Sequence, residues 1–425
     1  MREMKDSCVS WIGTVPSDWI RKKVKNAVSL IGSGTTPASS CLQYYESEDV
    51  NWIQSGDIYG IDTIIKTNTM ISNAAVRSLS ALHVYNPDFI VVAMYGGSVG
   101  NIAISKIEAC VNQACCCIRT DNQNDLKFMY YWIYMCKSDF LRVSEGGGQP
   151  NISQAKIRNQ YYMQPPLAEQ RRIADFLDTK CAEIDALTAD IQTQIDTLEQ
   201  YKRSVITEAV TKGLNPDAEM KDSGIEWIGE IPATWNIIRG KYLFKYLQKP
   251  VKEDDGVITC FRDGEVTLRS NRREDGFTMS DKEIGYQGID VGDLVVHGMD
   301  GFAGAIGISD SRGKASPVLN VMDTKQNKRY IMYYLRSMAY SDVFVALATG
   351  IRVRSCDLRW NKLADLPYPV PNIEEQIAIV EYIDATLEKT DAVITEKKSQ
   401  IETLDEYKKS LIYEYVTGKK EVPSL

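Results

Sequence analysis

The sequence MKDSCVSWIGTVPSDW, at residues 4–19, returns as MKDSGIEWIGEIPATW at residues 220–235. Nine of the sixteen positions are identical, among them two tryptophans, a glycine and a proline in one register. Two more pairs repeat downstream: Glu169-Gln170 with Glu375-Gln376, and Tyr201-Lys202 with Tyr407-Lys408. The chain is therefore predicted to be a tandem of two related halves, with two places for binding.

The segment 165–214 is predicted to form one long helix. Pro165 and Pro166 stand where the helix would start, and Gly213 stands where it would stop. Apolar residues recur once in seven along it, at Leu177, Ile184, Ile191, Leu198 and Val205. A helix of roughly 40–45 residues would be about 60–70 Å long, and its apolar stripe would need a partner.

The segment 371–418 repeats this pattern between Pro371 and Gly418. Thr390 and Lys397 interrupt its stripe, whose apolar positions are Leu387, Ile394, Ile401, Leu404 and Leu411. Because each stripe needs a partner, we expect the two long helices to pack on each other as a coiled coil.

The remaining segments have the patterns of mixed α/β domains. Short apolar strands punctuated by glycine occur in both halves, which favours a twisted or barrel-like sheet. Aromatic-rich helices are predicted at 126–144 and 328–345, and their aromatic stripes are interpreted as core. The predicted order is a domain at 1–164, a long helix at 165–214, a domain at 215–370, and a long helix with a tail at 371–425.

The composition is that of a chain with sizeable cores and no membrane segment. Of the 425 residues, 44% are hydrophobic and 25% are charged, and no run approaches the roughly 18 apolar residues of a membrane span. The first residues lack the apolar run of a secretory signal, so a cytoplasmic location is expected. The ten cysteines are then expected to be reduced structural thiols.

The formal charge of −8 is unevenly distributed along the chain. The segments 165–214 and 371–418 carry −3 and −6, so the rest of the chain sums to +1. Acidity therefore belongs to the predicted long helices, and the two domains are free to carry local basic faces.

No catalytic or metal site is predicted. The only histidines are His83 and His297, and no Cys-x-x-Cys pair occurs. Asn86-Pro87-Asp88-Phe89 is similar to a motif of amino-methyltransferases, but it lacks the second proline and an upstream glycine-rich cofactor loop. Gly313-Lys314 lacks the Ser/Thr of a phosphate loop. The residues favour a binding protein over an enzyme.

Basic and amide residues cluster in loops that differ between the halves. Arginine, glutamine and asparagine read guanine and adenine edges with two hydrogen bonds, and glycine allows the backbone to approach phosphate closely. The candidate DNA contacts are Tyr95, Gln149, Asn151, Arg262, Arg269, Arg272, Arg273, Lys314, Arg352 and Arg354. The alternative interpretation of the same residues is a solvated charged surface.

Taken together, these motifs resemble the specificity subunit of type I restriction–modification enzymes. The resemblance rests on the paired Trp-Ile-Gly-x-x-Pro-x-x-Trp openings and on PPLAEQRRIADFLD at 165–178, which EQIAIVEYID repeats at 375–384. The runs QPNIS at 149–153 and VGDLVV at 291–296 are also similar to family patterns. The resemblance covers essentially the whole chain.

This resemblance implies two target recognition domains, each reading one half of a split double-stranded DNA sequence, and two antiparallel helices that act as a spacer. It implies two modification subunits that methylate adenine with S-adenosylmethionine, and motor–nuclease subunits that need ATP and Mg. The chain itself is expected to be non-catalytic and to bind no cofactor or metal. The ten apolar positions named above are then residues of the helix or partner interface.

The sequence departs from the family pattern in two places. Asn372 stands where a second proline is usual, and the arginine-rich loop at 350–354 does not match the loop Gly-Gly-Gln-Pro-Asn of the first half. The two half-sites are therefore not expected to be read by like residues. A rival hypothesis is a bivalent scaffold that joins proteins through its helices without reading DNA, which the overall acidity would suit. The target bases and the gap length do not follow from these patterns.

Overall fold

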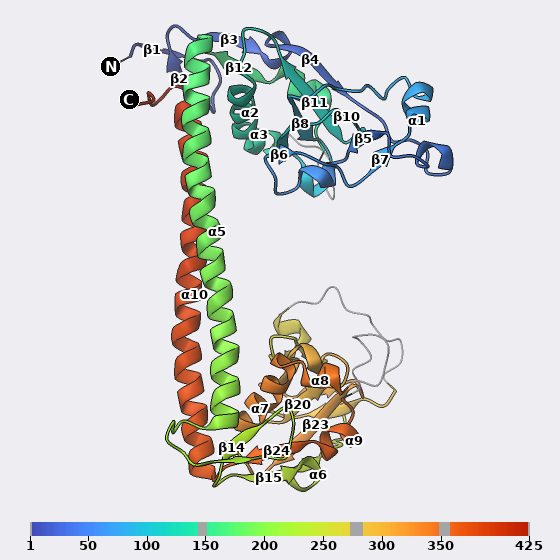
Figure 1. The fold of residues 1–425 in the computed structure, drawn as a ribbon, viewed down its shortest axis with the longest axis vertical. Helices are drawn as coiled ribbons and strands as arrows, with labels where there is room; N and C mark the ends of the chain where they lie inside the picture. The colour runs from blue at the N-terminus through green and yellow to red at the C-terminus, as the bar shows by residue number, and fades with distance from the viewer. Residues whose placement is uncertain (1, 143–150, 273–283, 348–357, 424–425) are drawn as a thin grey trace. The chain divides into compact units, whose positions relative to one another are not determined.

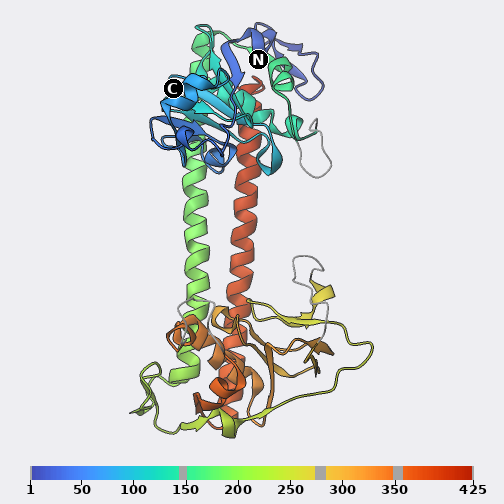
Figure 2. The same cartoon turned by 90° about the vertical axis from the view of Figure 1, so that its right-hand side faces the viewer.

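The computed structural model describes residues 2–142, 151–272, 284–347 and 358–423 (Figures 1 and 2). They form two units, of which the first contains Met1–Asp190 and Gln400–Leu425 and the second contains Ile191–Ser399. Each of the two long helices begins in one unit and ends in the other. The division into four segments drawn from the sequence therefore stays a prediction.

The long helices are α5 at Leu167–Lys212 and α10 at Ile373–Val416, with 46 and 44 residues. Each is followed by a glycine with positive φ, Gly213 or Gly418, which is the conformation that commonly ends a helix. Asn372 replaces the usual proline by capping α10, because its side chain accepts a hydrogen bond from the Glu375 amide at 2.9 Å. The two long helices predicted from the sequence are confirmed.

Within each unit, α5 and α10 run antiparallel and side by side (Figures 1 and 2). In the first unit, Lys408 of α10 donates to Asp185 of α5 at 2.8 Å. In the second unit, Lys202 of α5 donates to Asp391 of α10 at 2.6 Å. The repeated Tyr-Lys pairs therefore make the same ion pair twice, with the two helices exchanging roles, and this reciprocity sets the register.

The ten apolar positions predicted on the helices are all buried or half-buried. Six are buried, namely Leu177, Ile184, Ile191, Val205, Ile394 and Leu411. Four are half-buried, namely Leu198, Leu387, Ile401 and Leu404. Thr390, which interrupts the stripe, is buried as well, and its hydroxyl donates to the Thr386 carbonyl at 2.7 Å. A threonine that satisfies its own hydroxyl in this way can occupy an apolar seam.

The first unit contains a five-stranded sheet in the order β4-β11-β8-β9-β6. Its strands are β4 (Val28–Ser33), β6 (Thr63–Ile64), β8 (Phe89–Ala93), β9 (Ile102–Ser105) and β11 (Cys115–Thr120). A smaller sheet has the order β10-β5-β7, with β10 (Ala109–Val111), β5 (Val50–Ile53) and β7 (Met70–Ile71). Two pairs complete the unit, β1 (Met4–Asp6) with β2 (Thr14–Pro16) and β3 (Ile20–Lys23) with β12 (Tyr161–Gln164).

The second unit repeats the central sheet in the order β16-β23-β20-β21. Its strands are β16 (Phe244–Tyr246), β20 (Leu294–His297), β21 (Ile306–Ile308) and β23 (Leu319–Thr324). The paired strands around it are β13 (Met220–Asp222) with β14 (Glu230–Pro232), β15 (Asn236–Arg239) with β24 (Pro367–Val370), β17 (Ile258–Cys260) with β18 (Val266–Leu268), and β19 (Gln287–Ile289) with β22 (Gly313–Ala315). The described strands of both units form open sheets and no closed barrel.

The inner strands β8 and β20 are buried on both faces, so they have apolar runs without alternation. In β8, Ile90 and Val92 pack toward the helices, and Phe89 and Val91 pack toward the smaller sheet. The helix-side face is covered by an aromatic helix, α2 (Leu126–Met135) in the first unit and α7 (Lys328–Tyr340) in the second. The prediction that these aromatic stripes are core is confirmed, since their side chains lie in the core clusters.

The aromatic helices are shorter than the sequence predicted. The run 126–144 breaks after Met135 into α2 and α3 (Lys137–Arg142), and the run 328–345 breaks after Tyr340 into α7 and α8 (Val343–Ala346). In the second case Asp342 adopts a left-handed conformation with φ 55°, which ends the helical path. The remaining short helices are α1 (Asn73–Ser78), α4 (Gln154–Asn159), α6 (Gly240–Leu243) and α9 (Trp360–Asp365).

A joint between sheet domain and long helix is built twice from repeated residues. In the first unit, the Trp19 indole donates to Glu169 Oε2 at 3.3 Å, and in the second the Trp235 indole donates to Glu375 Oε1 at 2.9 Å. Both tryptophans are fully buried. The tryptophan that ends each opening motif is thus tied to the first turn of a long helix.

The glutamine of each Glu-Gln pair is the buried centre of the joint. The Gln170 side chain accepts from the Asp125 amide at 2.8 Å, and the Gln376 side chain accepts from the Asn327 amide at 2.9 Å. Each glutamine also donates to the carbonyl of the proline five residues before it, at 2.8 Å. Because Asp125 and Asn327 are the N-caps of α2 and α7, each glutamine connects the start of a long helix to the start of an aromatic helix.

A tyrosine and an aspartate complete each joint. Tyr131 donates to Asp178 at 2.8 Å, and Tyr333 donates to Asp384 at 2.5 Å. A basic residue of the aromatic helix, Lys127 or Arg329, pairs with the same aspartate. The joint is thus made of Trp19, Tyr131, Glu169, Gln170 and Asp178 in the first unit and of Trp235, Tyr333, Glu375, Gln376 and Asp384 in the second.

Candidate nucleic-acid interface

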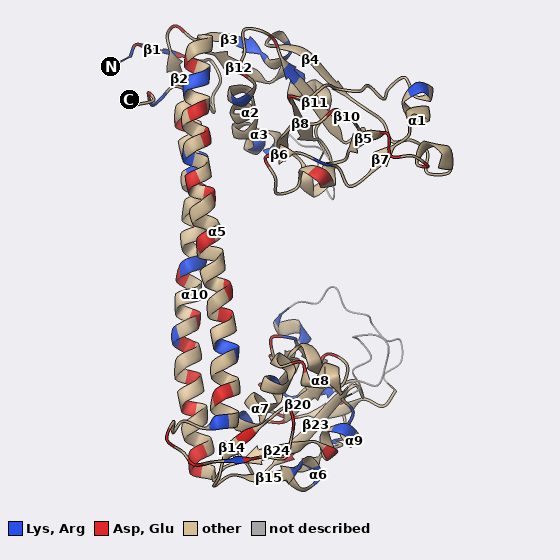
Figure 3. Cartoon of the chain, viewed as in Figure 1, with Lys and Arg blue, Asp and Glu red and all other residues tan. Residues whose placement is uncertain are grey.

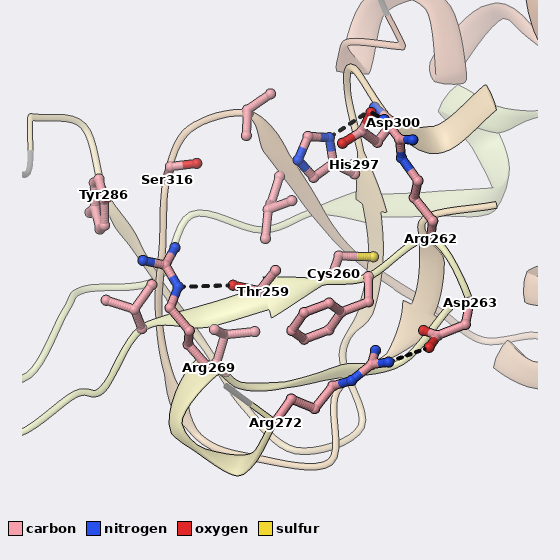
Figure 4. A pocket seen from close by; sticks show the side chains of 15 residues that line it. Thr259, Cys260, Arg262, Asp263, Arg269, Arg272, Tyr286, His297, Asp300 and Ser316 are labelled. Carbon is pink, nitrogen blue, oxygen red and sulfur yellow. Dashed lines mark hydrogen bonds and ion pairs between the residues drawn. The ribbon is translucent and has the colours of Figure 1, made fainter. Parts of the chain in front are cut away.

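A hollow of about 670 Å³ opens on the second unit, beside the hairpin β17–β18 and the end of β20 (Figure 4). Its walls come from the hairpin and the segments near Tyr286, Ser316 and Asp300. The polar side chains that line it belong to Thr259, Arg262, Asp263, Arg269, Arg272, Tyr286, His297, Asp300 and Ser316. Three of the arginines predicted to contact DNA are therefore brought together at one concave surface.

Carboxylates and a ring orient these arginines. Arg262 donates to Asp300 at 2.9 Å, and Arg272 pairs with Asp263 at 2.8 Å (Figure 4). The Arg272 guanidinium also lies over the Phe261 ring, 4.2 Å from its centroid. Such contacts hold an arginine in one direction before any ligand arrives, which lowers the entropy cost of binding.

The ion pairs at the rim are weak enough to be exchanged. The Arg262 side chain is 58% exposed, and its partner Asp300 is 34% exposed. Exposed pairs of this kind contribute roughly 0–1 kcal/mol, so a phosphate or a guanine edge can replace the carboxylate at little cost. Arg269 lies deeper, where its Nε donates to the Thr259 hydroxyl at 3.4 Å.

His297, which was not among the predicted contacts, also lines this hollow. Its Nδ1 accepts hydrogen bonds from the Met299 and Asp300 amides at 3.2 and 3.0 Å. Phe261, under Arg272, was missed as well. Comparison of the two halves could have found His297, because it ends β20, the strand equivalent to β8, whereas β8 ends at Ala93.

The other predicted contacts of the second half do not join this group. Lys314 lies in β22, where its backbone pairs with Gly288 and bridges to Val257, and its side chain is not part of the lining. Arg273, Arg352 and Arg354 lie outside the described residues. Whether these three residues contact DNA stays a prediction.

In the first half, Tyr95 and Asn151 are brought together. They form an isolated antiparallel bridge, and Tyr95 is 45% exposed. The Ile152 amide donates to Met94 at 2.9 Å, as the Leu358 amide donates to Gly298 at 2.8 Å in the second half. Gln149 lies outside the described residues. The loop after the central strand thus has the same support in both units, but it presents different residues.

The charged residues of the long helices do not form one basic face. Figure 3 shows Lys and Arg interspersed with Asp and Glu along α5 and α10.

Within the described ranges, no group of three or more His, Cys, Asp or Glu side chains could hold a metal ion. None of the described helices is long and apolar enough to cross a membrane. Burial raises the pKa of Cys116 to about 12, as expected for a thiol inside a sheet.

Comparison with known proteins shows that the chain is similar to type I restriction enzyme specificity subunits. Residues 16–197 match the model of the type I restriction modification DNA specificity domain. The match spans the first sheet domain and part of α5. The full-length relatives extend the similarity across the second half.

Two of these relatives come from Methanocaldococcus jannaschii. The type I restriction enzyme MjaVIII specificity subunit is 24% identical over 438 residues, covering 97% of this chain and 95% of the relative. The putative MjaX specificity subunit is 23% identical over 436 residues, covering 97% and 96%. The EcoKI specificity subunit of Escherichia coli K12 is 26% identical over 213 residues, covering 47% of this chain and 44% of the relative.

Solved structures share the fold. A chain from a type I R-M system, studied for complex assembly and conformational transition, has a TM-score of 0.68 at 14% identity and covers 96% of this chain and 99% of that one. The HsdS subunit from Thermoanaerobacter tengcongensis has a TM-score of 0.51 at 13% identity, covering 96% and 98%. These likenesses confirm the mixed α/β architecture with two long helices.

Proposed function

We propose that this chain is the DNA sequence-recognition subunit of a type I restriction–modification complex. Each unit holds one target recognition domain, and the two read the halves of one split double-stranded target. The observation that carries this proposal is a contrast inside the molecule. Repeated residues build the same joint twice, whereas the polar surfaces beyond the joint differ.

The hollow of the second unit has the chemistry to read a DNA half-site. Its arginines offer donors that match phosphate oxygens and the O6 and N7 acceptors of guanine. Arg262 and Arg272 are oriented by carboxylates that are partly exposed, so binding exchanges one ion pair for another. The first unit uses another surface, around Tyr95 and Asn151.

The long helices carry a repeated exposed surface that fits two copies of one partner. Leu187 and Val393 are 48% and 42% exposed, and Tyr201 and Tyr407 are 49% and 55% exposed. In each pair the two residues are 206 positions apart, like the three joint residues that lie on the long helices. Apolar side chains that are repeated but not buried mark a binding surface, and the two modification subunits are its proposed occupants.

Catalysis is proposed to belong to the partners. The modification subunits supply S-adenosylmethionine-dependent adenine methylation, and motor–nuclease subunits supply ATP- and Mg-dependent cleavage. This chain is proposed to recognise the target sequence and to contribute no reacting group. We expect this chain to act in the cytoplasm, together with the DNA it reads.

Modification-sensitive sequencing tests this proposal. The DNA comes from cells that co-express the chain with its modification subunit. We expect methylated adenine within two short sequences separated by a fixed gap. An assembled complex that yields no methylated motif would contradict the proposal and favour the bivalent scaffold. Tyr201→Ser combined with Tyr407→Ser should abolish copurification of the modification subunit, and each single change should remove one copy.

A further inference from the structure

The two units differ at the end of the central strand. In the first unit β8 ends at Ala93, which pairs with Cys115 of β11. In the second unit β20 ends at His297, which pairs with Leu319 of β23. His297 lies 204 residues after Ala93, and Leu319 lies 204 residues after Cys115. Ala93 and His297 therefore occupy the same position in the two sheets. Ala93 is fully buried, whereas His297 is partly exposed and lines the hollow.

The hydrogen bonds at Nδ1 fix the tautomer of His297. This nitrogen accepts from two backbone amides, those of Met299 and Asp300, so it carries no proton. The proton of the neutral ring is therefore on Nε2. Burial lowers the pKa of His297, Asp300 opposes this effect, and Arg262 adds to it. A second proton would have to bind Nδ1, where it would point at the Met299 and Asp300 amide N–H groups. This repulsion keeps the ring neutral.

The Nε2–H group is available to a ligand. Among the described residues, none accepts a hydrogen bond from it. The buried side-chain atoms that lack a partner are Trp52 Nε1 and Gln287 Oε1, so His297 Nε2 is not one of them. In Figure 4 this nitrogen lies on the side of the ring away from Asp300. The ring thus has one edge engaged with the backbone and one edge open to the hollow.

We infer that His297 is a specificity-determining residue of the second unit, whose Nε2–H donates a hydrogen bond to an acceptor on a DNA base edge. The inference rests on the proposed function and deepens it. Purine N7, guanine O6 and thymine O4 can accept this bond in the major groove. Adenine N6 and cytosine N4 are donors, so a base that presents either of them at this point is disfavoured.

A neutral donor acts differently from the arginines beside it. Whatever bases they contact, Arg262 and Arg272 also attract phosphate at long range, so part of their contribution is affinity for every sequence. The His297 ring carries no charge and adds nothing to nonspecific attraction. Its removal should therefore change sequence preference without changing the salt dependence of binding.

His297→Asn separates reading from folding. The asparagine Oδ1 takes the place of Nδ1 and keeps the two backbone hydrogen bonds, whereas its Nδ2–H donors lie closer to the backbone than Nε2–H and do not reach the same acceptor. We expect the variant to lose roughly 5- to 10-fold in discrimination at one base position of one half-site. Its thermal stability and the slope of binding against salt concentration should match those of the wild type. Discrimination is measured with the assembled complex on duplexes that differ by single bases.

Two further variants serve as controls. His83→Asn changes the only other histidine, which is exposed in the first unit, and should leave both half-sites unchanged. His297→Phe removes the acceptor as well as the donor, so it should lower the melting temperature in addition to relaxing the half-site. Loss of discrimination in His297→Phe alone would assign the histidine a structural role and overturn the inference.

The experiment distinguishes the inference from the proposed function. A split methylated motif for the wild type together with an unchanged motif for His297→Asn overturns the inference and leaves the function standing. A wild-type complex that assembles and methylates no split motif overturns both. Relaxation of one position in one half, with stability retained, supports both.

Discussion

The two halves of this molecule are alike at the joint between sheet domain and long helix, and they differ at the surfaces proposed to contact DNA. At the joint, the indole, glutamate, glutamine, tyrosine and aspartate recur in the same contacts, with distances that differ by a few tenths of an ångström. At the end of the central strand, one half has a buried alanine and the other half has a partly exposed histidine at the equivalent position. The repeated residues therefore build the joints, and the residues proposed to recognise DNA lie at positions that differ between the halves.

The largest effect is expected from lengthening the helix pair, within the segment 180–205 of α5. The ion pairs set the opposing positions, so seven residues are inserted between 196 and 197 and between 396 and 397. At 1.5 Å per residue, the gap in the methylated motif should grow by about three base pairs while both half-sites stay the same. Binding to the original target should fall by about 1,000-fold or more, to the level of nonspecific DNA. An unchanged gap would disprove the spacer role of the helices.

The joint should be equally sensitive in both halves. Gln170→Ala and Gln376→Ala each leave buried backbone groups without partners, which should cost about 2–4 kcal/mol of unfolding free energy. Urea unfolding of the purified chain measures the loss, and Gln200→Ala, at an exposed position of α5, is the matched control with about 0.5 kcal/mol or less. A large loss in one half and none in the other would show that the repeated joint is not equivalent.

The recognition surface should be sensitive in one half only. Arg272→Ala with Arg273→Ala removes the guanidinium over Phe261 and its neighbour in sequence, and should cost about 1–3 kcal/mol at the half-site read by the second unit. Single-base variants of each half-site measure the change, so the other half-site is the internal control. Equal loss at both half-sites would indicate general damage to the chain.

The smallest effect is expected at the reciprocal ion pairs. Double-mutant cycles on Lys408 with Asp185 and on Lys202 with Asp391 should each give a coupling energy of about 0.5–1 kcal/mol, because one partner in each pair is largely covered and the other is exposed. Both couplings should weaken together as salt is raised. Couplings that differ by more than about 1 kcal/mol would argue against a shared register.

The sequence predicted the parts of the fold that follow from periodicity and from local stop signals. The heptad-like stripe, the prolines before Leu167 and the glycines after both helices specify α5 and α10 to within a few residues. The aromatic helices were predicted too long, because a left-handed Asp342 and the break after Met135 leave no strong sequence mark. Glycine-punctuated strands indicated a twisted sheet but could not show that it stays open.

The candidate site was predicted only in part. Clustering in sequence was enough to bring Arg262, Arg269 and Arg272 together, since they share one hairpin and its following turn. It could not identify the carboxylates that orient the arginines, because Asp300 is 38 residues away from Arg262 in the chain. It also passed over His297, whose open edge depends on two backbone amides that only the folded loop supplies.

The most direct test of the account compares methylation motifs from cells that co-express the modification subunit with the wild-type chain or with its Arg272→Ala, Arg273→Ala variant. We expect a split adenine motif for the wild type. For the variant, we expect a motif that is relaxed in one half and identical in the other half and in the gap. A variant motif that is altered in both halves, or in the gap, would contradict the division of the molecule into repeated joints and separate reading surfaces.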